Sequence, residues 1–179
     1  GGNVGIGTTT PGSKLEVAGT ARITNTLTLA PSGDQALNVS TGSIYKGGAL
    51  FIHTKGGPNN TALGQSALAN GTTGFNNTAI GSGALYSNTT GSDNTADGWG
   101  ALLQNSSGAH NTANGRRALT SNTTGFFNTA SGSGALYSNT TGSRNTACGV
   151  SALGSNTTGY RNTASGYHAL LVNSAGDEN

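Results

Sequence analysis

Side chains that could carry out chemistry are few in this sequence and are scattered along it. The histidines are His53, His110 and His168, and no two of them are related by an internal repeat. Asp93 and Asp97 are four residues apart, but no comparable carboxylate pair recurs, and general acid–base catalysis needs positioned groups. No nucleophile elbow, Walker loop, HExxH or CxxC motif occurs. The sequence therefore predicts no catalytic residue, no metal ligand and no cofactor. We expect that the protein is not an enzyme.

Cysteine usage and charge exclude further classes of function. Cys148 is the single cysteine, so neither an intrachain disulfide nor a thiolate metal cluster can form. Eight basic and six acidic residues give a formal net charge of +2, which does not provide a basic surface for nucleic acid or an anionic membrane. No apolar run is long enough to span a bilayer. We expect no nucleic-acid partner and no membrane insertion of this segment, and we interpret the adjacent Arg116 and Arg117 as a solvated surface rather than an anion-contacting spot.

Aromatic side chains are the best candidates for binding. Exposed aromatic rings offer a large contact area at a low entropy cost and can stack on sugar faces. The alternative is that the same rings cover seams between repeats or chains. The candidate receptor- or glycan-contacting residues are Tyr86, Trp99, Phe126, Phe127, Tyr137, Tyr160 and Tyr167.

A 17-residue repeat organises the chain from Asn60 onward, without insertion or deletion. Counting each unit from its first asparagine, positions 1 to 3 are always Asn-Thr-Ala, positions 8 and 9 are always Ala-Leu, and positions 5 and 15 are always glycine. The seven units start at Asn60, Asn77, Asn94, Asn111, Asn128, Asn145 and Asn162. The leucine column, which we expect to form the core, is Leu68, Leu85, Leu102, Leu119, Leu136, Leu153 and Leu170.

The repeat predicts an all-β fold. Two glycines per unit and a run of turn-forming Asn, Thr and Gly residues would interrupt helices repeatedly. Short strands around Asn-Thr-Ala and around Ala-Leu, joined by tight turns of constant length, are typical of a β-solenoid in which equivalent positions stack. Stacked asparagines and threonines can then form hydrogen-bonded ladders. We predict a β-solenoid, or β-roll, over residues 58–179 and a β-strand stalk or connector over residues 1–57.

A homotrimer is predicted from the small size of the core. Each unit has three invariant apolar residues, and two of them are alanine. Ordering 17 residues costs on the order of 25 kcal/mol, far more than the ~1.5–3 kcal/mol of one buried leucine. From Lys14 to Ala30 the chain alternates with period two, which predicts a one-sided strand that three intertwined copies could bury. We expect partner chains to supply a second buried face, and position 4, the column of Cys148, to line that contact.

Two segments resemble known fibre proteins. The run from Gly2 to Gly19, Gly-Asn-Val-Gly-Ile-Gly-Thr-Thr-Thr-Pro-Gly-Ser-Lys-Leu-Glu-Val-Ala-Gly, resembles a stalk motif of phage tail fibres and bacterial trimeric fibre proteins. The Asn-Thr-Ala-x-Gly repeats resemble the head coils of trimeric autotransporter adhesins, although those coils are shorter than 17 residues. The resemblance implies a parallel trimer, an extracellular location on a bacterial surface or phage particle, and a role in attachment to a cell-surface glycan or protein receptor.

Three functions fit these expectations to different degrees. The first is a structural and adhesive fibre segment. The second is an ice-binding solenoid, because threonines recur at regular spacing, although we expect the threonines beside asparagine and glycine to lie in turns. The third is a glycan-degrading enzyme of the tail-spike kind, which needs a cleft of recurring acids that six scattered acidic residues do not provide.

Overall fold

The computed structural model describes residues 4–6, 15–17, 43–46, 49–53 and 56–179, and side chains from residue 56 onward. The chain divides into two compact units, residues 1–39 and 40–179. In the first unit, β1 (Val4–Ile6) pairs in parallel with β2 (Leu15–Val17). The rest of the stalk motif and of the predicted strand from Lys14 to Ala30 lies outside the described residues.

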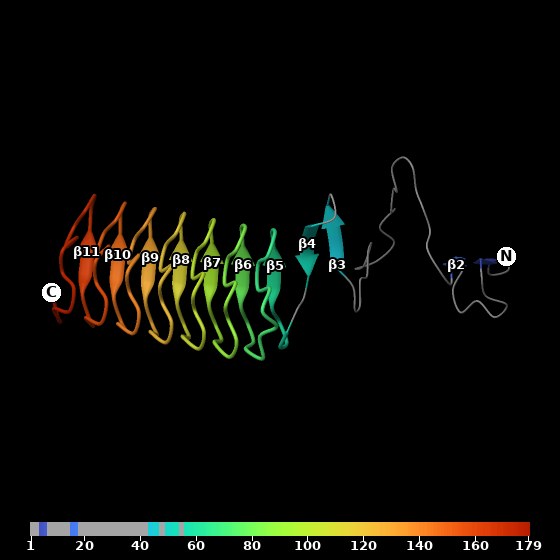
Figure 1. Ribbon diagram of the computed structural model, residues 1–179, viewed down its shortest axis with the longest axis horizontal. Coiled ribbons are helices and arrows are strands. Elements are labelled where there is room, and N and C mark those ends of the chain that lie inside the picture. The colour runs from blue at the N-terminus through green and yellow to red at the C-terminus, as the bar shows by residue number, and fades with distance from the viewer. Residues whose placement is uncertain (1–3, 7–14, 18–42, 47–48, 54–55) are drawn as a thin grey trace, which may run out of the picture. The chain divides into compact units, whose positions relative to one another are not determined.

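The second unit contains one sheet of nine strands in chain order (Figure 1). It begins with the antiparallel pair β3 (Ser43–Lys46) and β4 (Ala49–His53), and β4 is antiparallel to β5. The strands from β5 to β11 are parallel to one another: β5 (Thr61–Leu63), β6 (Thr78–Ile80), β7 (Thr95–Asp97), β8 (Thr112–Asn114), β9 (Thr129–Ser131), β10 (Thr146–Cys148) and β11 (Thr163–Ser165). Two strands within the predicted stalk range, residues 1–57, therefore pair with the solenoid sheet.

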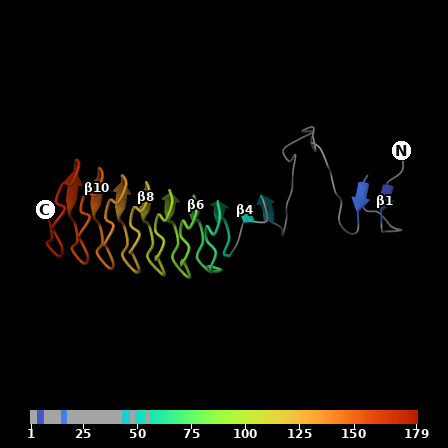
Figure 2. The same ribbon diagram turned by 45° about the horizontal axis from the view of Figure 1, so that its top comes forward.

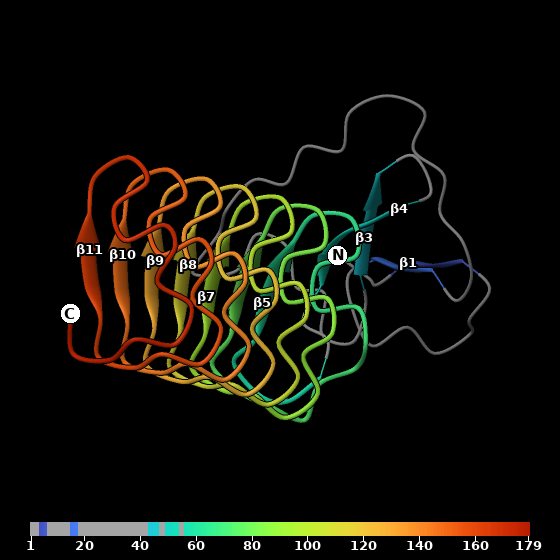
Figure 3. The ribbon, with the colours of Figure 1, turned by 60° about the vertical axis from the view of Figure 1, so that its left-hand side comes forward.

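Identical positions stack on one another, so the predicted β-solenoid of 17-residue coils is confirmed. Thr95 lies opposite Thr112 and Ala96 opposite Ala113, and the same register holds for every parallel pair. One strand per coil forms a row, and the remainder of each coil returns behind it (Figures 2 and 3). The return segments also bond coil to coil; the N–H of Leu85, for example, donates to the carbonyl oxygen of Ala101 at 3.0 Å.

The prediction of a second strand in each coil, around Ala-Leu, is wrong. That run is a turn, and the leucine column has φ between 47° and 52°, the left-handed region that bulky side chains rarely adopt. The turn aims each leucine inward. Six of the seven leucines and both alanine columns of those coils are fully buried. Leu170, also predicted to be core, is 39% exposed because no coil of the chain lies over it.

Two ladders of buried asparagines complete the core. At position 1, Asn94 donates from its backbone N–H and its side-chain Nδ2 to Oδ1 of Asn77, at 3.1 and 3.2 Å. At position 12, Nδ2 of Asn105 donates to Oδ1 of Asn88 at 2.9 Å. Both ladders meet at the glycine of position 15, because Asn94 and Asn105 each donate to the carbonyl oxygen of Gly108 at 2.9 Å. Buried polar groups are thus paired along the solenoid, as a stable interior requires.

The first coil departs from this pattern, and a threonine substitutes for the missing asparagine. Position 12 of that coil is Gly71, which has no side chain to begin the second ladder. The hydroxyl of the buried Thr72 accepts instead from Nδ2 of Asn88 at 3.0 Å and from the N–H of Gly74 at 2.8 Å. Thr72 therefore caps the second ladder at its first coil.

The core closes within a single chain over the described coils. The three invariant apolar columns and the asparagine ladders are buried there without a second copy. The small apolar core that suggested partner chains is thus supplemented by polar ladders inside each coil. Association of chains, including the predicted homotrimer, stays a prediction.

Candidate binding surface

The surface of the solenoid is built from the variable columns of the repeat. The strands from β7 to β11 follow the pattern exposed–buried–exposed at positions 2 to 4, and the alanine of position 3 is buried in every coil. Positions 6, 7 and 10 follow the strand, and positions 16 and 17 precede the next one. Because stacking fixes the backbone of every coil, a side chain in any of these columns changes the surface without changing the core.

All seven aromatic candidates are exposed. The least exposed is Tyr137, at 39%, and the most exposed is Tyr167, at 75%. Within this chain they therefore do not form buried seams between coils. The fold separates them into two sets at opposite ends of the strands: Tyr86, Trp99, Tyr137 and Tyr167 at positions 6 and 10, and Phe126, Phe127 and Tyr160 at positions 16 and 17.

In the set that precedes the strands, Phe126 and Phe127 contact other rings and Tyr160 contacts an arginine. The ring of Phe127 stacks on His110 of the preceding coil with centroids 4.7 Å apart, and Phe126 meets Phe127 edge to face at 5.7 Å. Arg161 lies over the ring of Tyr160, with its guanidinium carbon 5.5 Å from the ring centroid. Arg161 also forms an exposed ion pair with Glu178 at 2.7 Å. Each ring of this set therefore already contacts a neighbouring ring or a guanidinium group.

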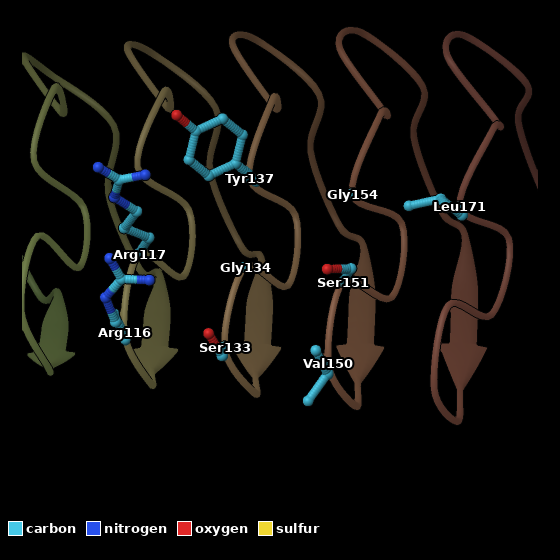
Figure 4. A pocket seen from close by; sticks show the side chains of 9 residues that line it. All are labelled: Arg116, Arg117, Ser133, Gly134, Tyr137, Val150, Ser151, Gly154 and Leu171. Atoms are coloured by element: carbon cyan, nitrogen blue, oxygen red, sulfur yellow. The ribbon is translucent and has the colours of Figure 1, made fainter.

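Two members of the set that follows the strands, Trp99 and Tyr137, line a groove, whereas Tyr86 and Tyr167 do not. One pocket of about 350 Å³ is bordered by Arg116, Arg117 and Tyr137, with Val150 and Leu171 farther along (Figure 4). A second pocket of about 230 Å³ is lined by residues that include Trp99 and shares Arg117 and Tyr137 with the first. We name the two adjoining pockets the corner groove. Sequence reasoning offered Trp99 and Tyr137 as separate candidates and did not join them to the arginines, because their proximity depends on the path of the return segment.

Residues that could do acid–base or metal chemistry are not brought together. Asp93 accepts a hydrogen bond from Asn76 at 3.0 Å, and Asp97 lies on the outer face of β7. Among the described residues no group of three or more His, Cys, Asp and Glu side chains could hold a metal ion. Cys148 is a free, exposed thiol. Residues 56–179 and the described strands before them include no helix long and apolar enough to cross a membrane.

The triplets that match an N-glycosylation signal at position 12 have a structural role. Asn88, Asn105, Asn122, Asn139 and Asn156 are at most 1% exposed, and their side-chain amides belong to the second ladder. Among these five, Oδ1 of Asn156 alone has no hydrogen-bond donor. These amides are engaged in the core and are not presented to solvent.

Comparison of the chain with protein-family models, with curated proteins and with solved structures finds no match in any of the three.

Proposed function

We propose that this chain is a structural and adhesive segment of an extracellular fibre, of the kind carried on a bacterial surface or a phage tail, that attaches to a cell-surface glycan or protein. One observation carries the proposal. The invariant asparagine, alanine and leucine columns of the repeat are buried in the coils before the last one, whereas the seven aromatic candidates, which occupy variable columns, are exposed on the surface. Such a rod can hold a constant shape while its surface acquires binding residues coil by coil.

The homotrimer is part of this proposal. Position 4 lies on the outer face of the sheet, where partner chains could pack, and its first two members, Leu63 and Ile80, are apolar. The rest of the column, which contains Cys148, is polar or small. Sedimentation equilibrium of the folded chain is expected to give three chain masses. A mass of one chain at micromolar concentration would refute the trimer while leaving the adhesive role open.

Attachment is tested with the same sample on a glycan array and on immobilised surface proteins of candidate host cells. We expect binding that falls when exposed aromatic residues are replaced by the residue of a sister coil, such as Tyr137→Thr, which copies Thr120. The control is Tyr160→Ser, which copies Ser92 in the other aromatic set. No detectable binding to either target class would refute the adhesive role.

Ice binding is a second candidate, favoured by one specific observation. The position-2 threonines lie in the strands rather than in the turns; Thr112 and Thr129, for instance, are exposed on the outer face of the sheet. Neighbouring strands are ~4.8 Å apart, so this column is a regular row of hydroxyl and methyl groups. The adjoining position-4 column is irregular, with Asp97, Asn114 and Ser131 in succession. Thermal hysteresis at micromolar protein, abolished by Thr112→Lys, would establish this function; freezing at the equilibrium point would exclude it.

A further inference from the structure

Two arginines of one coil have no ionic partner among the residues that the structure describes. Arg116 and Arg117 occupy positions 6 and 7 of the coil that contains β8, where two sister coils have Ser-Gly. Over the described residues the salt bridge is Arg161 with Glu178, and neither groove pocket is lined by a carboxylate. Arg116 is exposed and Arg117 is half-buried, so both charges lie at the solvent boundary. An anion is the chemical partner that this pair lacks.

The ring of Trp99 holds the two guanidinium groups together. Their central carbons lie 5.1 Å and 4.8 Å from its centroid, within the ~6 Å range of a cation–π contact. The two guanidinium carbons are therefore at most 9.9 Å apart, the sum of 5.1 and 4.8 Å, and like charges within the Debye length of ~10 Å at 0.1 M salt repel. Guanidinium groups bind carboxylate and sulfate oxygens through paired, charge-assisted hydrogen bonds. Trp99 is therefore a positioning residue, and its ring face is occupied by the arginines rather than free for a sugar.

The corner groove continues from this cationic end along the stack. Its residues come from the coil of Trp99 through the coil of Leu171, which is four coil steps or about 19 Å at ~4.8 Å a step. Ser133, Gly134, Ser151 and Gly154 keep it open between the arginines and Leu171 (Figure 4). Tyr137, 39% exposed, lines both pockets, and among the described residues no other ring and no cation stacks on it. The groove thus joins one anion-binding end to a neutral stretch with an aromatic wall.

We propose that the corner groove binds an acidic polysaccharide, with a carboxylate or sulfate group on Arg116 and Arg117 and a sugar ring against Tyr137. This inference rests on the proposed adhesive function and specifies its ligand. The charge spacing favours a glycan over a nucleic acid. Duplex DNA carries a charge every ~1.7 Å, which calls for cations along the whole groove. Here the lining cations belong to a single coil.

The test compares two double variants of the full chain that remove the same charge. R116S/R117G gives this coil the Ser-Gly pair found at Ser133 and Gly134, a sequence that the fold already accommodates at these positions. R144N/R161N, the matched control, places at position 17 the residue found at Asn76. The probes are polygalacturonate, dextran sulfate, neutral dextran and oligo-dT, measured by biolayer interferometry at 50 and 200 mM salt. Far-UV circular dichroism confirms that each variant is folded.

The expected result is binding of polygalacturonate and dextran sulfate, but not of neutral dextran, that weakens with salt. R116S/R117G lowers the affinity at least about tenfold, the effect of ~1.4 kcal/mol, and R144N/R161N changes it less than about twofold. An equal loss in both variants overturns the inference, because net charge alone would then explain binding. Stronger binding of oligo-dT than of either acidic polysaccharide, or no binding of the two acidic polymers, also overturns it.

Failure of this inference is distinguishable from failure of the adhesive function. If the chain binds neutral glycans or proteins on the arrays, and R116S/R117G leaves that binding unchanged, the adhesive role stands and the acidic-glycan groove does not. If the chain binds neither the arrays nor the four polymers, both proposals fall. A further variant, Trp99→Ser, copies Ser82 and separates positioning from charge, since it keeps both arginines. It is expected to weaken polygalacturonate binding with little change in salt dependence; unchanged affinity would refute the positioning role.

Discussion

Replacing Asn128 with alanine would show how much the first asparagine ladder stabilises the coil stack. Its Oδ1 accepts from the backbone N–H and Nδ2 of Asn145 at 3.0 and 3.2 Å, and its Nδ2 donates to the carbonyl oxygen of Gly142 at 2.8 Å and to Oδ1 of Asn111 at 3.1 Å. Alanine leaves the buried N–H of Asn145 without this acceptor. One unpaired buried donor costs ~1–3 kcal/mol and each of the three further lost hydrogen bonds about 1 kcal/mol. We expect the free energy of unfolding to fall by roughly 4–6 kcal/mol.

The assay is urea unfolding followed by far-UV circular dichroism, with the wild-type chain and two controls. Thr129→Ala removes a neighbouring exposed side chain on β9 and should cost less than ~1 kcal/mol. Asn128→Asp keeps an acceptor for Asn145 but turns an oxygen toward the carbonyl of Gly142, so it should remain destabilised. A loss for Asn128→Ala within ~0.5 kcal/mol of that for Thr129→Ala would refute the view that the ladder holds the coils together.

The other predictions concern the core, the glycine columns and the outer face of the sheet. Leu136→Ala should lower the free energy of unfolding by about 2–4 kcal/mol, and Leu170→Ala by under ~1 kcal/mol, because only the first side chain is buried; equal losses by urea titration would contradict this. Gly125→Ser should cost at least ~2 kcal/mol more than Gly134→Ser, since a Cβ at Gly125 meets the carbonyl oxygen of the glycine above it, whereas position 7 already accommodates serine. If partner chains cover β10, Cys148 should react with iodoacetamide more slowly in the native sample than in the unfolded chain. A native rate equal to the unfolded rate would argue against packing of chains on this face.

The sequence allowed the period, the position-2 to position-4 strands and the inward leucines to be predicted, because seven units report on the same environment. The conformation of the leucine turn could not be predicted. Left-handed φ is unfavourable for leucine on its own, and it is stabilised here by burial and by hydrogen bonds between coils, such as that from Leu85 to Ala101. Both effects depend on contacts between coils, so the conformational preference of the local sequence does not reveal them.

The second asparagine ladder and the corner groove were missed for related reasons. Asn122 occupies a run that favours turns equally whether its amide faces solvent or the interior, so its burial is a property of the closed coil. The groove depends on Trp99, Arg117 and Tyr137, which come from three successive coils and different columns. The signal available was the adjacency of Arg116 and Arg117 at two positions that are Ser-Gly in two sister coils.

The constant 17-residue length of the coils also restricts how such a chain can change its length. Because each coil bonds to its neighbours through the same atoms, unequal recombination that adds or removes a multiple of 17 codons leaves every ladder continuous. A shift by any other number would bring Gly108 or its equivalents against side chains for which there is no space. Rod length can therefore vary in discrete steps between related genes, while Thr72 and the other departures of the first coil remain in place as the cap.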